Sequence, residues 1–206
     1  MFKRIKYFIF KLIYGNITQI LKSKNNKNIT LKKISFTNSH TYNFYNIFNG
    51  RVYSDTVNNT AYILDNSLIK DASYQYKLKK NLKIINGNIF DNFVIKNGTP
   101  KFLKKIDGSI FSLLSGGAAK NNYWHWIFDV LPRLGICEKI INIKSIDFFL
   151  LPDNKKKFQI ETLDILNIPK IKQISSVEYR HIQTDNLFIT SHPVVLSNNA
   201  TKDIQN

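Results

Sequence analysis

The chain has 206 residues, enough to bury the core of one large or two small domains. Hydrophobic residues make up 43 % of it and aromatic residues 13 %, which argues against a disordered chain. The net charge of +16 suggests a nucleic-acid partner, but the excess is mostly scattered Lys, accompanied by Asn, Ile, Phe and Tyr from adenine- and thymine-rich codons. We therefore expect no nucleic-acid partner, while contact with anionic lipid or phosphorylated sugars remains open.

The first 14 residues are expected to form an amphipathic helix. Its apolar residues share one face: Phe2, Ile5, Phe8, Ile9, Leu12 and Ile13. Lys3, Arg4 and Lys11 lie opposite. Lysines interrupt the segment too often for it to span a bilayer, and it lacks the cleavage site of a secretory signal. Two interpretations stay open: peripheral membrane contact through residues 1–14, and a helix packed on the domain.

Composition divides the chain into three segments: a basic helix over 1–21, a linker over 22–49 and a domain over 50–206. The linker is rich in Lys, Asn, Ser and Thr without a sustained period, and one or two short strands are expected within it. The domain begins β-rich, with residues 51–57 and 61–64 flanking Asn58-Asn59 as a predicted hairpin. Further short strands are predicted near 82–85, 92–95 and 110–114.

After Leu114 the pattern becomes that of an α/β unit. Helices are predicted over 121–143 and 156–166, and strands over 146–151, 171–174 and 187–190. The apolar run from Asp147 to Leu151 is typical of a strand buried on both faces. The fold class is therefore α/β with a β-rich N-terminal section. The one cysteine, Cys137, lies among isoleucines and is expected to be an inert buried thiol in a reducing compartment.

The segment 115–119 connects an apolar strand to a helix whose cap is Asn121 or Asn122. Gly116 and Gly117 permit close approach of a ligand to the backbone, and the helix N-terminus would offer N–H groups to a phosphate or carboxylate. The alternative is a tight strand-to-helix turn. The spacing matches neither a Walker loop nor a dinucleotide fingerprint.

His125 and Asp129 stand four residues apart, so their side chains can meet on one helical face. A carboxylate beside imidazole suits a general base that takes a proton from a hydroxyl. The alternatives are an Asp129–Arg133 ion pair and a satisfied core histidine. Trp124 and Trp126 point to different sides of the helix, so a sugar-stacking role and a core role are both open.

Pro132 should kink the helix near residues 128–131. No Asp-x-Asp and no zinc-ligand spacing occur, so no metal or other cofactor is expected. The remaining histidines, His40, His181 and His192, stand alone and are interpreted as structural or surface residues.

The run Asn122-Tyr-Trp-His-Trp-Ile-Phe-Asp-Val-Leu-Pro-Arg133 resembles the signature Asn-Tyr-x-His-Trp-x-x-(Asp or Glu)-x-Leu-Pro-Arg of family-61 glycosyltransferases, the capsular polysaccharide biosynthesis type. Residues 51–65, 149–166 and 185–193 resemble the segments that flank this motif, so the likeness covers about 50–195. The resemblance implies a Rossmann-like α/β unit, the N-terminal half of a GT-B enzyme that transfers sugar from a nucleotide-sugar with inversion.

Carried across residue by residue, the resemblance makes Asn122, His125 and Asp129 the candidate acceptor-binding and catalytic positions, with Arg133 as support. It implies a glycan or lipid-linked acceptor at the cytoplasmic face of the membrane, in surface polysaccharide biosynthesis. The donor-binding half of such enzymes is not recognisable in this chain, so we expect the isolated chain to be inactive as a transferase. The alternative is a noncatalytic module, derived from a transferase, that binds a glycan or a partner.

Overall fold

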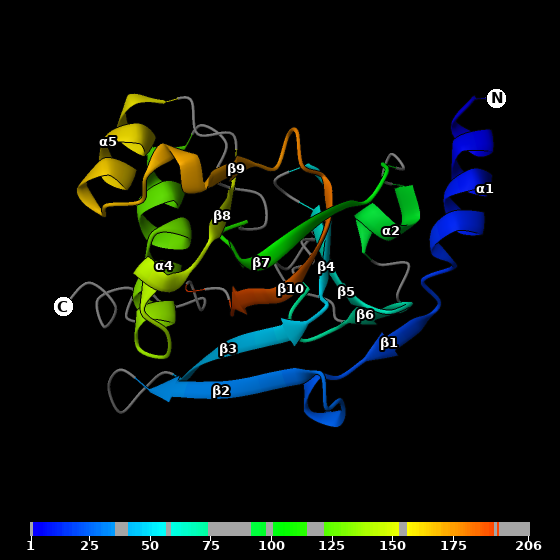
Figure 1. Cartoon of the computed structure of the whole chain (residues 1–206), viewed down its shortest axis with the longest axis horizontal. Helices are drawn as coiled ribbons and strands as arrows, with labels where there is room; N and C mark the ends of the chain where they lie inside the picture. The colour runs from blue at the N-terminus through cyan, green and yellow to red at the C-terminus, as the bar shows by residue number, and fades with distance from the viewer. Residues whose placement is uncertain are drawn as a thin grey trace, which may run out of the picture.

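The computed structural model describes residues 2–35, 41–56, 59–73, 92–97, 101–114, 122–152, 156–191 and 193. The chain forms one ten-stranded mixed sheet, with helices at its two ends (Figure 1). The helices are α1 (Phe2–Tyr14), α2 (Phe93–Asn97), α3 (Tyr123–His125), α4 (Pro132–Glu138) and α5 (Lys157–Ile165). The strands are β1 (Gln19–Leu21), β2 (Ile29–Ser35), β3 (Thr41–Phe48), β4 (Arg51–Thr56), β5 (Asn59–Leu64), β6 (Ser67–Ile69), β7 (Lys104–Ser112), β8 (Phe148–Leu151), β9 (Gln173–Ser175) and β10 (His181–Thr190). A mixed α/β fold with a sheet-rich core is thus confirmed.

Four strands form the parallel half of the sheet, in the order β9-β8-β7-β10. Numbered along the chain, this order is 3-2-1-4, the arrangement of the first four strands in a doubly wound dinucleotide-binding sheet. The chain passes from β7 to β8 through α3 and α4, and from β8 to β9 through α5. The predicted strand–helix–strand alternation is confirmed, although residues 176–180 connect β9 to β10 without a helix.

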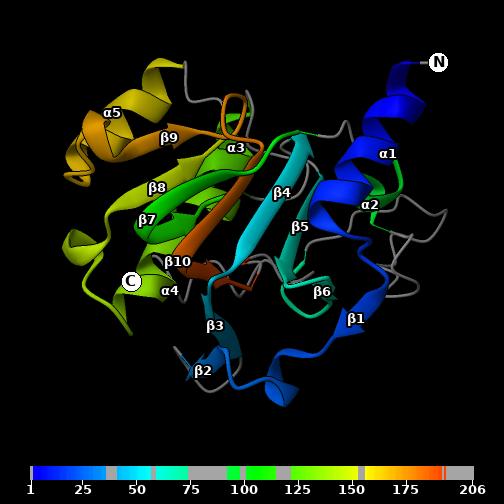
Figure 2. The same ribbon diagram turned by 45° about the vertical axis from the view of Figure 1, so that its right-hand side comes forward.

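β10 joins the parallel half to the β-rich half (Figure 2). Its first residues pair with β4, and its last residues, from Asn186 to Thr190, pair with β3. The chain leaves β3 and enters β4 at Gly50, where a Cβ would lie 2.9 Å from both the Ile47 carbonyl oxygen and Leu187 Cβ. A glycine is therefore required by the close approach of β10 at this corner.

The interpretation of 22–49 as a linker is corrected by two long strands. β2 and β3 pair along their whole length, and β3 pairs in turn with β10. β3 is buried on both faces, since Phe44 and Tyr45 belong to different hydrophobic clusters. Asn46 Nδ2 donates to Asn186 Oδ1 at 3.2 Å across the β3–β10 pair. β2 and β3 are therefore part of the sheet of the domain.

The other element predictions have mixed outcomes. The pairing of β4 with β5 is confirmed, but Asn59, predicted to lie in the turn, is the first residue of β5 and pairs with Thr56. α1 forms as expected. The strand predicted at 92–95 is wrong: the Asn92 side-chain oxygen accepts from the N–H groups of Val94 and Ile95 and starts α2 instead. The segment 171–174 is partly a 3-10 turn and partly β9. The strand expected at 82–85 lies outside the described residues.

Two hydrophobic clusters lie on opposite faces of the sheet, as alternating residues of β7 and β8 show. Phe111 and Phe149 belong to the cluster that contains Trp126 and Cys137, whereas Ile110 and Leu150 belong to the other. β8 is buried on both faces, as predicted. Cys137 is a buried free thiol, as expected, and burial raises its pKa to about 12.

His181, at the start of β10, is a buried structural histidine, as expected. Its Nε2 accepts from Arg51, 3.0 Å from Arg51 Nη2 and 3.3 Å from Nε. Because guanidinium can only donate, the ring proton is on Nδ1, which donates to the Lys101 carbonyl at 3.0 Å. Burial, followed by the Arg51 charge, lowers the pKa of His181 to about 4. His181 is therefore neutral at physiological pH. His40 and His192 lie outside the described residues.

Candidate functional site

The segment between β7 and β8 begins at a helix cap supplied by Asn122. Its Oδ1 accepts from the N–H groups of Trp124 at 3.0 Å and His125 at 3.4 Å. Two of the otherwise unpaired N–H groups of the helix start are satisfied in this way. Asn122, predicted to bind substrate, is thus observed to fix where the helix begins, and with it the position of His125.

The helix loses its regular α-helical geometry just before Pro132, close to residues 128–131, where a kink is predicted. Pro132 has no N–H to donate, and its ring would clash with the carbonyl of Phe128 four residues earlier. Residues Trp126–Val130 form a π-helical turn in which the Leu131 N–H donates to the Trp126 carbonyl at 3.1 Å. α4 then restarts with Pro132 at its first turn. Such single π-helical turns occur often at functional sites.

The side chains of His125 and Asp129 meet across this turn, with Nδ1 2.6 Å from Oδ2. The His125 side chain is 37 % exposed, but that of Asp129 is only 3 % exposed. Burial raises the pKa of Asp129, while the hydrogen bond and charge of His125 and the charge of Arg133 lower it. Of the two groups, only His125 can reach a molecule arriving from solvent.

The pairing also determines which nitrogen of His125 is available. An ionised carboxylate can only accept, so Nδ1 carries the proton that it donates to Asp129 Oδ2. In neutral imidazole, Nε2 then holds the free lone pair. The sequence left open which of the two residues is the base, whereas the geometry favours His125, with Asp129 orienting the ring.

Arg133 is predicted to bind substrate or to support the other site residues, and its position fits the supporting role. It is 3 % exposed, and its Nε donates to the Asp129 backbone carbonyl at 3.0 Å. Its charge also lowers the pKa of Tyr62, which burial raises more strongly. Tyr62 bonds Ser112 at the end of β7, with 2.8 Å between their hydroxyl oxygens. Arg133 therefore joins the site to the sheet and does not present a surface for ligand.

The two tryptophans have different environments. Trp126 is fully buried, and its Nε1 donates to Thr162 Oγ1 of α5 at 2.8 Å. Trp124 is 48 % exposed and packs edge-on against the His125 ring, with 5.2 Å between ring centroids. Its ring also packs against Phe128, with 4.8 Å between centroids. A half-exposed indole beside a histidine suits contact with a sugar ring. Trp126 is thus the core residue, and Trp124 remains the candidate for binding a sugar.

The site follows β7, whose carboxyl end lies beside that of β10 in the parallel half. The order of the strands reverses between these two, and open α/β sheets bind ligands at the carboxyl ends of strands at such points. Gly116 and Gly117, predicted to approach a ligand, follow β7 in the sequence and lie outside the described residues.

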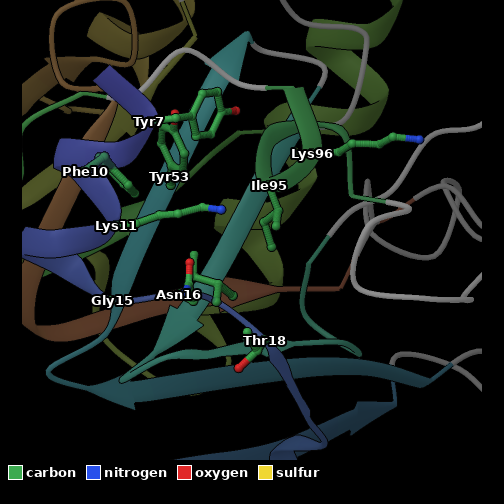
Figure 3. A pocket seen from close by; sticks show the side chains of 10 residues that line it. Tyr7, Phe10, Lys11, Gly15, Asn16, Thr18, Tyr53, Ile95 and Lys96 are labelled. Carbon is green, nitrogen blue, oxygen red and sulfur yellow. The ribbon is translucent and has the colours of Figure 1, made fainter. Parts of the chain in front are cut away.

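Three cavities among the described residues lie away from His125. One of about 540 Å³ lies between α1 and α2, where the Lys11 side chain extends into the space between them (Figure 3). Two others, of about 250 Å³ and 220 Å³, adjoin Lys101 and Phe102. None of these three contains His125. We favour the His125 position because its chemistry is specific, whereas a volume alone identifies no reaction.

Metal ligands are not clustered in the part of the chain that the structure describes: no group of three or more His, Cys, Asp or Glu side chains is placed to hold an ion. Comparison of this chain with protein-family models, curated proteins and solved structures finds no match.

Helical spacing groups several side chains of this site on one face of the helix, although spacing alone does not say whether that face is buried. Five buried residues follow helical spacing: Trp126, Asp129, Val130, Arg133 and Leu134. A carboxylate and a guanidinium within a core-facing stripe are unusual, since charged side chains are rarely buried without a partner. Ser112 and Tyr62, which adjoin this stripe from the sheet, are not identified by this spacing.

Proposed function

We propose that this chain is the acceptor-side half of an inverting glycosyltransferase, in which His125 deprotonates the acceptor hydroxyl. The observation that carries the proposal is the 2.6 Å contact between His125 and the buried Asp129, on a helix that follows the first strand of the parallel half. The resemblance of residues 122–133 to the family-61 signature supports the same reaction class. The strand order 3-2-1-4 is compatible with the N-terminal half of a GT-B enzyme.

In the proposed reaction, the acceptor oxygen attacks C1 of the donor sugar from the face opposite the nucleotide. The new bond joins this oxygen to C1, and the bond from C1 to the phosphate oxygen breaks. The nucleoside diphosphate leaves with the electron pair of that bond, and His125 Nε2 takes the proton of the acceptor hydroxyl. Asp129 then stabilises the imidazolium that forms, because its Oδ2 already accepts from Nδ1.

The proposed acceptor is a glycan or lipid-linked sugar in surface polysaccharide biosynthesis, and the donor is a nucleotide-sugar. We place the reaction at the cytoplasmic face of the membrane. Trp124 would hold the acceptor ring by stacking, while His125 receives the proton from its hydroxyl.

Replacing Trp124 by Ala is expected to weaken binding of acceptor-type oligosaccharides at least about tenfold, because the stacking surface is lost. Stability should change little, since the side chain is half exposed. A glycan array probed with wild type, Trp124→Ala and Trp124→Phe measures the effect, and thermal unfolding serves as the stability control. Trp124→Phe keeps a ring and should retain most of the signal. Equal signals from wild type and Trp124→Ala would remove Trp124 from the site.

A further inference from the structure

The amphipathic helix α1 packs on the domain with the face opposite to the one that its apolar pattern suggests. None of its residues is fully buried. The partly buried residues of α1 are Tyr7, Phe10 and Tyr14. The six residues of the predicted apolar face are all exposed: Phe2, Ile5, Phe8, Ile9, Leu12 and Ile13. The structure thus leaves an apolar strip along the whole outer side of α1.

Specific contacts fix this orientation. The Phe10 ring lies 5.4 Å from the His181 ring and stacks on Tyr53 at 5.8 Å, measured between centroids. Tyr14 lies edge-on to His181 at 5.3 Å, and the Arg51 guanidinium lies over the Tyr14 ring at 5.9 Å. The Tyr14 hydroxyl oxygen accepts from the Leu103 N–H at 2.8 Å. Rotating α1 to bury its apolar strip would break all of these contacts.

Cations border the apolar strip. At 100° per residue, Arg4 and Lys6 fall on its two edges, and both are exposed. Residues 1–54 contain ten Lys and Arg and no Asp or Glu. Phe102, 76 % exposed, lines a small cavity together with Lys6 and Ile9 and so extends the apolar surface beyond the helix.

We propose that the outer face of α1, together with Phe102, binds the surface of a bilayer that contains anionic lipid. Apolar side chains of an in-plane helix enter the boundary between headgroups and acyl chains, and bordering Lys and Arg attract anionic headgroups. A second copy of the chain fits this face poorly. If two α1 faces met, the cations Arg4 and Lys6 of one copy would lie near those of the other and repel them, and α1 contains no acidic residue to pair with them. No helix in the described ranges has the length and apolar content needed to cross a bilayer.

Co-sedimentation of the full chain with vesicles tests this assignment. We expect binding to vesicles of phosphatidylcholine mixed with phosphatidylglycerol, and much weaker binding to phosphatidylcholine alone. Phe8→Ser combined with Leu12→Ser should lower partitioning at least about tenfold. Replacing Arg4 and Lys6 by Gln should lower it about fivefold for each charge, on the anionic vesicles only.

The matched control removes similar apolar surface at the far end of the molecule. Ile165, 76 % exposed, is the last residue of α5, and Ile171, 85 % exposed, belongs to the 3-10 turn that follows it. α5 and α1 lie at opposite ends of the molecule (Figure 1). Ile165→Ser combined with Ile171→Ser should leave vesicle binding unchanged. The proposal is overturned if wild type does not bind anionic vesicles, or if both Ser pairs reduce binding equally. A dimer in light scattering that only the α1 variant dissociates, without vesicle binding, would assign the face to self-association instead.

Discussion

Replacing His125 by Gln, in the presence of a donor-binding half that completes the proposed transferase, is expected to lower the turnover of glycosyl transfer about 10²–10⁴-fold, the usual contribution of a positioned general base. Gln keeps a polar side chain of similar reach but cannot accept a proton at neutral pH. The His125 side chain is partly exposed and Asn122 caps the helix independently, so folding should be intact. Turnover is measured as nucleotide release that depends on acceptor, and circular dichroism checks the fold.

Two further variants separate the roles within the site. Asp129→Asn should lower turnover by a smaller factor and change its pH dependence, because the imidazole remains but loses its carboxylate partner. Glu161→Gln, on the exposed side of α5, should leave turnover unchanged. Full activity of His125→Gln would remove His125 from the mechanism, and a larger loss in Asp129→Asn would reverse the assignment of base and orienting residue.

Acidification from about pH 7 to about pH 5 is expected to lower the free energy of unfolding by about 2 kcal/mol through His181 alone. Its pKa is about 4 in the folded chain, below its usual 6.5. The unfolded chain therefore binds more protons between these two values, so the stabilisation is present above about pH 6.5 and is lost as the pH falls. Protonation would place a second cation beside Arg51, under the Phe10 and Tyr14 rings of α1.

Urea unfolding at the two pH values, for wild type and His181→Gln, measures this contribution. Gln can still accept from Arg51 and donate to the Lys101 carbonyl, but it does not titrate. The other histidines are present in both proteins, so their effects cancel in the comparison. Wild type should lose about 2 kcal/mol more than the variant on acidification. Equal losses would show that His181 does not set the acid sensitivity.

The sequence predicted the parallel half well because its signals are local. The apolar run of β8 and the missing N–H of Pro132 each act within a few residues. The 125–129 contact likewise needs only helical spacing. Such features depend little on the rest of the chain.

The β-rich half was harder to predict because its strands are defined by distant partners. The hydrophobic pattern of β3 is hidden by Asn43 and Asn46, which are accommodated by hydrogen bonds to Tyr45 and to Asn186 of β10. Asn92 starts a helix where apolar residues suggested a strand. The burial of His181 depends on Arg51, 130 residues away in the chain. No local pattern contains these pairings.

The exposure of Trp124 and the burial of Asp129 also lay beyond the sequence. Helical spacing places His125 and Asp129 together, but it does not say which of them faces solvent. Packing of Trp126 against α5 decides this, because it turns Asp129 inward and leaves His125 at the surface. The choice of His125 as the base therefore comes from tertiary structure.

Sugar transfer itself is the most direct test of the proposed function. The chain, combined with a donor-binding half that completes the proposed transferase, is incubated with a panel of radiolabelled nucleotide-sugars and with glycan and lipid-linked acceptors. Label in the product is then compared between wild type and His125→Gln. We predict that wild type incorporates label from at least one donor, with inverted configuration at C1, and that His125→Gln does not. Absence of incorporation by wild type across the panel, or undiminished incorporation by His125→Gln, would contradict the account.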